Sequence, residues 1–201
     1  VSVVCTSLIT DMSYLLNNPS FNQDISSWDV SNVTNMSYMF NEAYSFNQDI
    51  GDWDVSSVTN MKGLFYSTQS FDHPIMDWDV SNVSDMSEMF QYSSFSQEIN
   101  NWDVSNVTNM QAMFYFSGFN QQINTWDVSN VTNMQEMFYF SQFNQQINTW
   151  DVSNVTNMYG IFWGLTTFNQ DIGSWDVSNV TDMSYMFQTC VTFNQDLSSW
   201  D

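Results

Sequence analysis

An Asp follows a Trp at the same place in eight successive segments of the chain, at steps of 24 or 25 residues, and seven of these Asp residues are followed two positions later by a Ser. Carboxylate and hydroxyl oxygens are hard ligands that suit Ca²⁺. The sequence therefore predicts a binding face made of one Asp column and one Ser column. The Asp column, which is also the candidate Ca²⁺ site, contains Asp29, Asp54, Asp79, Asp103, Asp127, Asp151 and Asp176, and the Ser column includes Ser31, Ser81, Ser105, Ser129, Ser153 and Ser178.

Like charges in such a column need a compensating arrangement. If successive carboxylates lie about 5 Å apart, each adjacent pair repels by about 1 kcal/mol in water. Each Asp could accept hydrogen bonds from its own turn, which would lower its pKa. Alternatively, Ca²⁺ ions could bind along the column, or the column could be a solvated platform for a carbohydrate or protein partner. These arrangements are compatible with one another, and the sequence favours the first.

A column of Asn residues carries sequons for N-linked glycosylation. In a secreted eukaryotic protein these Asn residues would carry glycans. In a turn that recurs in every segment, stacked Asn side chains would instead satisfy turn amides of neighbouring segments, and we favour this structural interpretation. The sequons begin at Asn32, Asn35, Asn82, Asn106, Asn130, Asn154 and Asn179.

Catalysis is the function class that the sequence supports least. Carboxylates about 5 Å apart approach the separation found in retaining glycosidases, but an acid and a base need different environments, and a column supplies identical ones. The chain has a single Lys, Lys62, a single His, His73, and no Arg to stabilise an oxyanion. We therefore expect a protein that is not an enzyme and that requires no cofactor, with Ca²⁺ as the one cofactor candidate.

The charge balance excludes two classes of partner. With 22 Asp and Glu residues against one cation, the formal net charge is −21. Binding to nucleic acid or to an anionic membrane requires clusters of Lys and Arg, so neither partner is expected, and any electrostatic partner is a cation or a basic protein. The chain has no apolar run long enough for membrane insertion. Its hydrophobic content of 43% nevertheless predicts a packed core.

The period of 24 or 25 residues predicts a repeat solenoid. We expect residues 1–201 to form one continuous domain of about eight repeats, the first divergent and the last truncated. In the second repeat, the spacing of Ile25, Trp28 and Val30 predicts a short strand over 25–30 that joins a parallel sheet. Met36, Met39 and Phe40 have the i, i+3, i+4 spacing of one helical turn. The fold expected is thus leucine-rich-repeat-like, with a right-handed parallel β-helix as the alternative.

Sulfur-containing residues are expected in the core. The Met columns sit beside Phe and are interpreted as adaptable core packing rather than as a soft-metal site. Cys190 falls in the column of Ala43, which predicts a buried free thiol. Cys5 belongs to the first repeat and Cys190 to the last, so the rod would hold them too far apart for a disulfide.

The segment from Phe21 to Met36, which reads FNQDISSWDVSNVTNM, resembles the repeat of about 25 residues known from surface lipoproteins of mycoplasmas and Listeria, which is counted among the BspA-like leucine-rich repeats. The resemblance extends over essentially the whole chain. It implies a secreted or cell-surface protein without established catalytic activity, and several related proteins are implicated in adhesion. The spacing of Ile25, Trp28 and Val30 is also that of a leucine-rich repeat.

These observations together predict a non-enzymatic, extracellular or cell-surface module that acts as a rigid structural and adhesive spacer. Its partners would be a protein or a carbohydrate at a cell surface, recognised by the acidic Asp and Ser face. The chain starts at Val1 without a leader and stops after Asp201, so we expect a trimmed product that is part of a longer chain or of an assembly. The alternatives are a Ca²⁺-loaded binding platform and an ice-binding or mineral-binding array.

Overall fold

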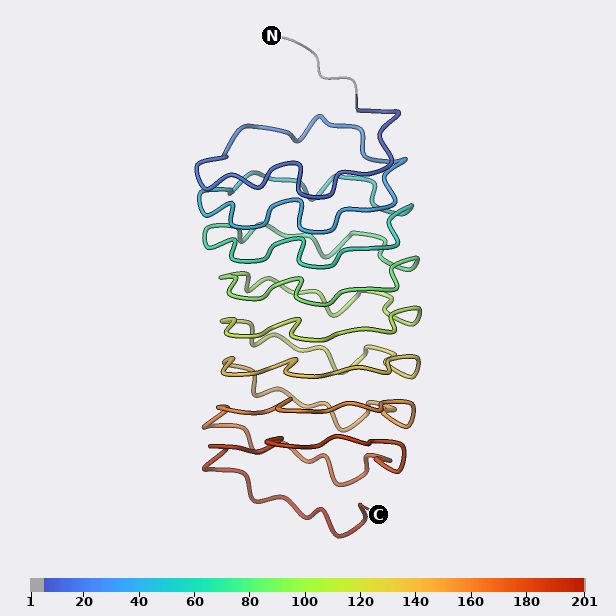
Figure 1. Ribbon diagram of the computed structural model, residues 1–201, viewed down its shortest axis with the longest axis vertical. Helices are drawn as coiled ribbons and strands as arrows, with labels where there is room; N and C mark the ends of the chain where they lie inside the picture. Colours follow the sequence, from blue (N-terminus) through green and yellow to red (C-terminus); the bar gives the residue numbers. More distant parts are fainter. Residues whose placement is uncertain (1–5, 201) are drawn as a thin grey trace.

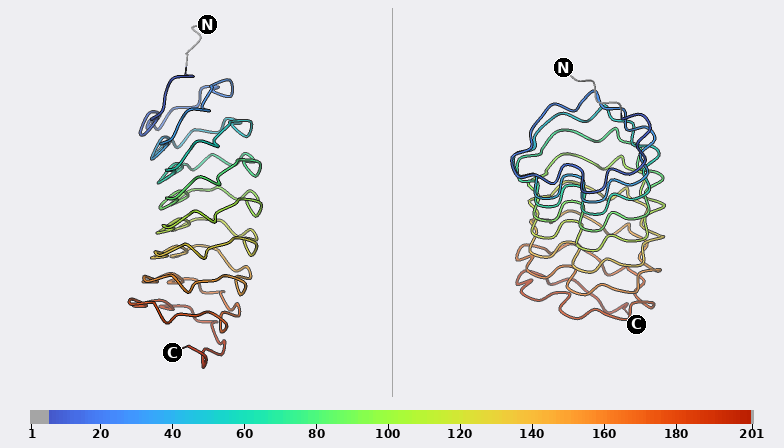
Figure 2. Two further views of the ribbon diagram at one scale, coloured as in Figure 1. Left: turned by 90° about the vertical axis from the view of Figure 1, so that its right-hand side faces the viewer. Right: turned by 45° about the horizontal axis from the view of Figure 1, so that its top comes forward.

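The computed structural model describes residues 6–200, which wind into coils stacked along one axis (Figure 1). The coils follow one another in sequence order from one end of the stack to the other, so each coil touches the coil before it and the coil after it (Figure 2). One isolated parallel β-bridge joins each successive pair of coils. The bridged residues are Asp11, Asn35, Asn60, Asp85, Asn109, Asn133, Asn157 and Asp182. The sequence repeat is therefore a repeat of structure.

Two expected elements are absent from residues 6–200, in which the structure has no helix and no strand longer than a single bridged residue. The strand predicted over 25–30 is wrong, because that segment turns. Trp28 donates its backbone N–H to the Ile25 carbonyl at 3.0 Å, which closes a tight turn and brings both apolar side chains to the same side. The parallel pairing occurs instead at Asn35, five residues beyond the predicted strand.

The helical turn predicted at Met36–Phe40 is also wrong. Met39 donates to the Met36 carbonyl at 3.1 Å, so the bond spans three residues, and Tyr38, the third residue of this turn, has φ 55°. That combination is typical of a type II turn, not of an α-helix. A second such turn follows from Phe40 to Ala43, with a bond of 3.0 Å and with Glu42 at φ 55°. Consecutive turns thus produce the i, i+3, i+4 apolar spacing that a helix would also give.

The positive-φ residues direct the backbone toward the neighbouring coil. Tyr38 donates its N–H to the Lys62 carbonyl at 2.8 Å, and Glu42 donates to the Tyr66 carbonyl at 2.9 Å. A helix would satisfy these groups internally, whereas here they join the coils. The first positive-φ column contains Tyr14, Tyr38, Gly63, Glu88, Ala112, Glu136, Gly160 and Tyr185, and the second contains Glu42, Ser67, Tyr92, Phe116, Phe140, Gly164 and Thr189.

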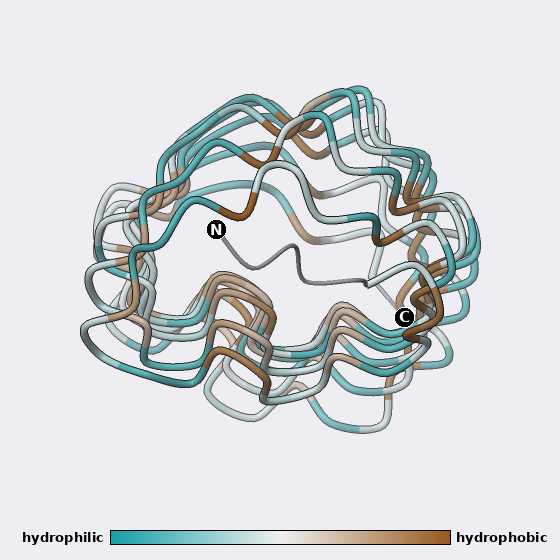
Figure 3. Ribbon diagram, turned by 90° about the horizontal axis from the view of Figure 1, so that it is seen from above, coloured by the Kyte–Doolittle hydropathy of each residue, from teal (hydrophilic) through white to brown (hydrophobic). Residues whose placement is uncertain are grey.

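Seen along the stack axis, the coils surround a central space (Figure 3). The buried side chains of the core lie inside the coils and stack on one another. The Phe40 and Phe65 rings are nearly parallel, with centroids 5.6 Å apart, and the Phe65 and Phe90 centroids are 5.7 Å apart. Such offset stacks contribute about 0.5–1.5 kcal/mol per pair beyond the burial of their area. Met36 and Met39 are fully buried beside them, which confirms the prediction that these Met columns pack in the core.

A ladder of indole hydrogen bonds ties seven Trp residues, from Trp53 to Trp200, each to the preceding coil. Trp53 Nε1 donates to the Ile25 carbonyl at 3.3 Å, and Trp126 Nε1 donates to the Ile99 carbonyl at 3.1 Å. The same bond is made by Trp78, Trp102, Trp150, Trp175 and Trp200. The ladder allows a large aromatic residue to be buried without an unpaired polar atom.

Cys190 is a buried free thiol, as the sequence predicts. It donates to the Phe162 carbonyl, and burial raises its pKa to about 11. The predicted separation from Cys5 lies outside the described residues. No helix in residues 6–200 has the length and apolar character needed to cross a membrane.

Candidate binding surfaces

The Asp column is exposed, and each of its described members closes a turn within its own coil. Asp29 Oδ1 accepts the Ser31 N–H at 3.1 Å and the Ser31 hydroxyl at 2.6 Å. The backbone bond recurs at Asp54, Asp79, Asp103, Asp127, Asp151 and Asp176. Hydrogen bonds to a charged carboxylate stabilise the charged form. The predicted turn-bonded arrangement is therefore confirmed, and Asp201 falls outside the described residues.

The hydrogen bonds from Ser lower the pKa of several of these carboxyls below the ordinary value. The Ser31 hydroxyl and then its backbone amide lower the pKa of Asp29, and the equivalent Ser groups lower the pKa of Asp79, Asp127 and Asp176. Within residues 6–200, no three His, Cys, Asp or Glu side chains are grouped so that they could hold a metal ion. Ca²⁺ binding along the Asp column stays a prediction.

The sequon Asn residues join neighbouring coils. Asn106 Nδ2 donates to the Ser81 carbonyl at 2.7 Å, and the equivalent bond is made by Asn32, Asn82, Asn130, Asn154 and Asn179. The expected contact between coils is present, but the Asn amide donates to a turn carbonyl, whereas a bond to a turn amide was predicted. Asn35 differs, because it accepts the Ser37 N–H at 3.1 Å and donates to Asp11 at 3.1 Å. Glycosylation stays a prediction at these sites.

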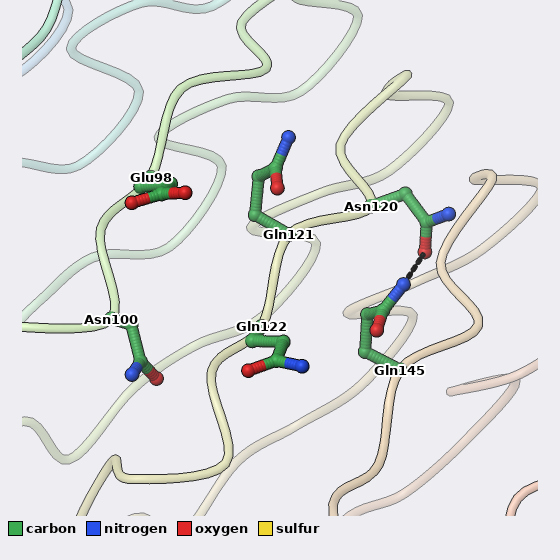
Figure 4. Close-up of a pocket in the computed structure, with 6 residues that line it drawn as sticks. All are labelled: Glu98, Asn100, Asn120, Gln121, Gln122 and Gln145. Carbon is green, nitrogen blue, oxygen red and sulfur yellow. Dashed lines mark hydrogen bonds between the residues drawn. The ribbon is translucent and has the colours of Figure 1, made fainter.

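The sequence analysis missed a groove lined by side-chain amides. Figure 4 shows this groove, in which Gln145 Nε2 donates to Asn120 Oδ1 at 3.2 Å. Its volume is about 440 Å³, and it shares Gln122 and Gln145 with an adjoining groove of about 310 Å³. Carboxamides donate and accept hydrogen bonds, so this surface suits a ligand rich in hydroxyl groups. The amide groove is lined by Glu98, Asn100, Asn120, Gln121, Gln122 and Gln145. The signal in the sequence was the Asn-Gln pair that follows Phe21, Phe46, Phe119, Phe143, Phe168 and Phe193.

A second missed surface is an aromatic strip outside the core. Tyr115 and Tyr139 stack with centroids 4.5 Å apart, Phe116 and Phe140 stack at 5.2 Å, and Tyr139 meets Trp163 at 5.1 Å. The rings touch from coil to coil, so the contacts form one continuous series. The aromatic strip consists of Tyr66, Tyr92, Tyr115, Phe116, Tyr139, Phe140, Trp163 and Tyr185. These positions vary in residue type between repeats, which is why the repeat pattern did not reveal them.

The three surfaces occupy different columns of the coil. The Asp column lies directly after the Trp, the amide groove lies in the loop after a core Phe, and the aromatic strip lies on the consecutive turns after Met36 and its equivalents. Each surface runs across several coils because every coil repeats the same backbone bonds. This arrangement suits an elongated ligand or several copies of a small one.

The family comparison agrees with the repeat. The chain belongs to the family described as "Mycoplasma protein of unknown function, DUF285", whose model matches residues 1–94, 75–142 and 116–201. The three matches overlap and together span the chain, which confirms the expected mycoplasma-type repeat family. Comparison with curated proteins and with solved structures finds no match.

Proposed function

We propose that this member of the family is a non-enzymatic adhesive spacer, a rigid rod that presents the Asp column to a partner at a cell surface. The observation that carries this proposal is the repetition of one turn in every coil, in which an exposed carboxylate is fixed by the Ser two residues later. Rows of identical, pre-positioned acceptors suit multivalent attachment, because linked weak contacts add to a strong overall affinity.

The backbone supports the spacer role. Thr132 donates its N–H to the Thr108 carbonyl at 2.9 Å, and Phe114 donates to the Met137 carbonyl at 2.9 Å, so several backbone bonds join each pair of successive coils. Bending the rod would strain these bonds and disturb the stacked rings of the core. A module of this kind holds its binding surfaces at a fixed spacing.

Placement outside the cell is part of the proposal. It is supported by the resemblance of the Phe21–Met36 segment to repeats of surface proteins, including the BspA-like leucine-rich repeats, and by the acidic charge, which favours a soluble, extended module. Protease treatment of intact source cells tests this placement. Cleavage of the protein while a cytoplasmic marker survives is expected, and protection of the protein until the cells are lysed would contradict it.

Adhesion is tested with beads coated with the protein and allowed to settle on a cell layer. In the test variant, all seven described Asp residues of the column are replaced by Asn, which keeps the turn acceptor, because Asn35 closes the same kind of turn in this structure. The control variant carries the same change at seven exposed Asp residues elsewhere, namely Asp24, Asp49, Asp52, Asp72, Asp77, Asp171 and Asp196.

Both variants lose seven charges, so a general effect of charge acts on them equally. We expect the column variant to lose most of its adhesion and the control to keep most of it. Equal loss in the two variants would mean that the column has no special role in attachment, and full adhesion of both variants would refute the proposal.

A carbohydrate ligand in the amide groove is the second candidate function. It is favoured by the groove itself, whose lining supplies five side-chain amides and one carboxylate and contains no apolar residue. Binding to an array of oligosaccharides tests it, with Gln122→Ala and Gln145→Ala as the groove variants and Gln188→Ala as a control outside the groove. Loss of the signal in the groove variants alone is the expected result, and an array without binding would exclude this candidate.

A further inference from the structure

The aromatic strip places large apolar rings on the surface of a strongly acidic protein. Tyr92 is 39% exposed, Phe116 46%, Phe140 42% and Tyr185 54%. In contrast, core rings such as Phe114 and Phe138 are completely buried. Contiguous exposed apolar surface of this kind marks interaction sites in soluble proteins. The rings also contact one another, so they present a continuous surface that is already ordered before any partner arrives.

The backbone under the strip is strained. Tyr92, Phe116 and Phe140 have φ of 56°, 49° and 48°, a region that bulky side chains rarely adopt. Ser67 and Gly164 occupy the same column, so the turn itself does not require an aromatic residue. Glu42 and Thr189 also have positive φ in this column, so the strain belongs to the turn. What distinguishes the strip is that aromatic rings stand exposed at these positions, although the turn accepts polar residues and Gly.

Tyr38, which contacts Tyr66 at one end of the aromatic strip, already has a cation beside its ring. Lys62 Nζ lies 5.9 Å from the centroid of the Tyr38 ring and 3.2 Å from Glu88 Oε1. The Tyr38 hydroxyl donates to Glu88 Oε2 at 2.7 Å, and the Tyr38 ring meets Tyr66 of the strip at 6.3 Å. The one Lys of the chain is thus held between a carboxylate and an aromatic ring.

Within residues 6–200, a similar carboxylate further along the strip, that of Glu136, has no cation beside it. Glu136 lies in the same column as Glu88, and a Cβ added at Gly160 would lie 3.5 Å from both Glu136 Cγ and Trp163 Cε3. The Glu136 side chain and the Trp163 ring therefore both lie next to Gly160. Among residues 6–200 the hydrogen-bond partner of the Glu136 carboxylate is Gln135, at 3.5 Å, and it has no ion pair.

We propose that the aromatic strip is the docking surface for an extended basic segment of a partner polypeptide, whose Arg or Lys side chains stack on the rings and pair with Glu136. Guanidinium groups combine a positive charge with a flat face, and they bind both carboxylates and aromatic rings. A second copy of this chain cannot supply such groups, since it carries one Lys and the same net charge of −21. The inference concerns a different surface from the Asp column and holds whether or not that column binds a partner.

The test measures binding of a nona-arginine peptide by the tryptophan fluorescence of the protein at 0.15 M salt, with a nona-lysine peptide as the comparison. The test variants are Glu136→Gln and a double change, Phe116→Ser with Phe140→Ser. Serine is compatible with this turn because Ser67 occupies the same column at φ 55°. The matched control is Asp171→Asn, which also removes one exposed negative charge but lies outside the Asp column, the amide groove and the aromatic strip. Circular dichroism and thermal unfolding verify that each variant is folded.

We expect nona-arginine to bind at least threefold more tightly than nona-lysine. Glu136→Gln and the double Ser variant should each weaken binding about tenfold, and Asp171→Asn should change it by less than twofold. If Glu136→Gln and Asp171→Asn weaken binding equally, the peptide responds only to net charge and the proposal is wrong. Binding of an oligosaccharide, or concentration-dependent dimers that the double Ser variant abolishes, with no binding of nona-arginine, would also overturn it.

Discussion

Two glycines in the positive-φ columns provide a matched test of the consecutive turns. Gly160 and Gly164 lie in neighbouring turns of one coil, with φ of 57° and 85°. A Cβ at Gly160 would meet its nearest neighbours at 3.5 Å, which is ordinary contact, whereas a Cβ at Gly164 would lie 2.5 Å from Phe140 Cγ. Replacing each by Ala therefore separates the backbone cost of positive φ from the cost of a steric clash with the coil before.

The backbone cost is shared by both variants. A residue with a Cβ in the left-handed region costs about 1–2 kcal/mol, and the loss of glycine's freedom in the unfolded chain offsets roughly 0.5–1 kcal/mol of this. Gly160→Ala should thus destabilise the protein by about 0.5–1 kcal/mol. Gly164→Ala must in addition displace the Phe140 ring, and such overpacking costs about 1–3 kcal/mol. The two contributions to the Gly164→Ala variant sum to about 1.5–4 kcal/mol.

Thermal unfolding followed by circular dichroism measures the difference. For a chain of this size, each kcal/mol shifts the Tm by about 2–4 °C, so we expect a fall of about 2 °C for Gly160→Ala and about 6 °C or more for Gly164→Ala. The reciprocal change, Ala112→Gly at φ 52°, should raise the Tm slightly because it removes strain. Equal shifts for the two Gly variants, or a larger shift for Gly160→Ala, would refute the stacking of Phe140 over Gly164.

Further predictions concern the Asp column, the indole ladder and the thiol. Hydrogen bonds from Ser lower the pKa of four carboxyls of the column, those of Asp29, Asp79, Asp127 and Asp176, below 3.8. Their contribution to stability is therefore complete above pH 3.8 and is lost as the pH falls through the folded pKa, so the Tm should fall below about pH 4, and a flat profile down to pH 2 would contradict this. Because the turn bonds already occupy the column, millimolar Ca²⁺ and EDTA should give Tm values within about 1 °C of each other; a shift of several degrees would establish the Ca²⁺-loaded alternative. Trp126→Phe should cost about 1–3 kcal/mol in urea unfolding, because it removes the indole bond to the Ile99 carbonyl, which keeps only the Trp102 N–H, and leaves space where the larger ring packed; an unchanged midpoint would show that this bond is dispensable. In a Cys5→Ser background, Cys190 should react with a thiol reagent at pH 8 only on unfolding, since burial raises its pKa to about 11; rapid reaction of the folded protein would contradict its burial.

The sequence predicts which residues stack, but it does not predict the backbone that stacks them. The period and the columns of Phe and Met follow directly from counting, because every coil places the same residue against the same neighbour. The turns cannot be predicted by counting, because the spacing of Met36, Met39 and Phe40 is shared by a helical turn and by two consecutive type II turns. Only the positive φ of Tyr38 and Glu42 distinguishes the two, and neither residue type signals it.

The candidate surfaces, too, could be predicted from the sequence only in part. The turn bonds of the Asp column could be predicted because an Asp and the Ser two residues later are neighbours within one turn. The aromatic strip could not, because its rings come from different columns of different coils and meet only after the coils stack. Gly63 and Gly160 were the available clue, since a glycine at a position occupied elsewhere by Tyr or Glu indicates a backbone with positive φ.

The central claim, that equivalent residues of successive coils lie directly over one another, is tested most directly by disulfide trapping in a chain without its native cysteines. Thr132 donates both its N–H and its hydroxyl to the Thr108 carbonyl, at 2.9 Å and 3.2 Å, and Thr156 does the same to Thr132. The pair Thr108→Cys with Thr132→Cys should form a disulfide under mild oxidation, whereas Thr108→Cys with Thr156→Cys, which skips one coil, should stay reduced. Cross-linking of the second pair and not the first would contradict the stacked arrangement.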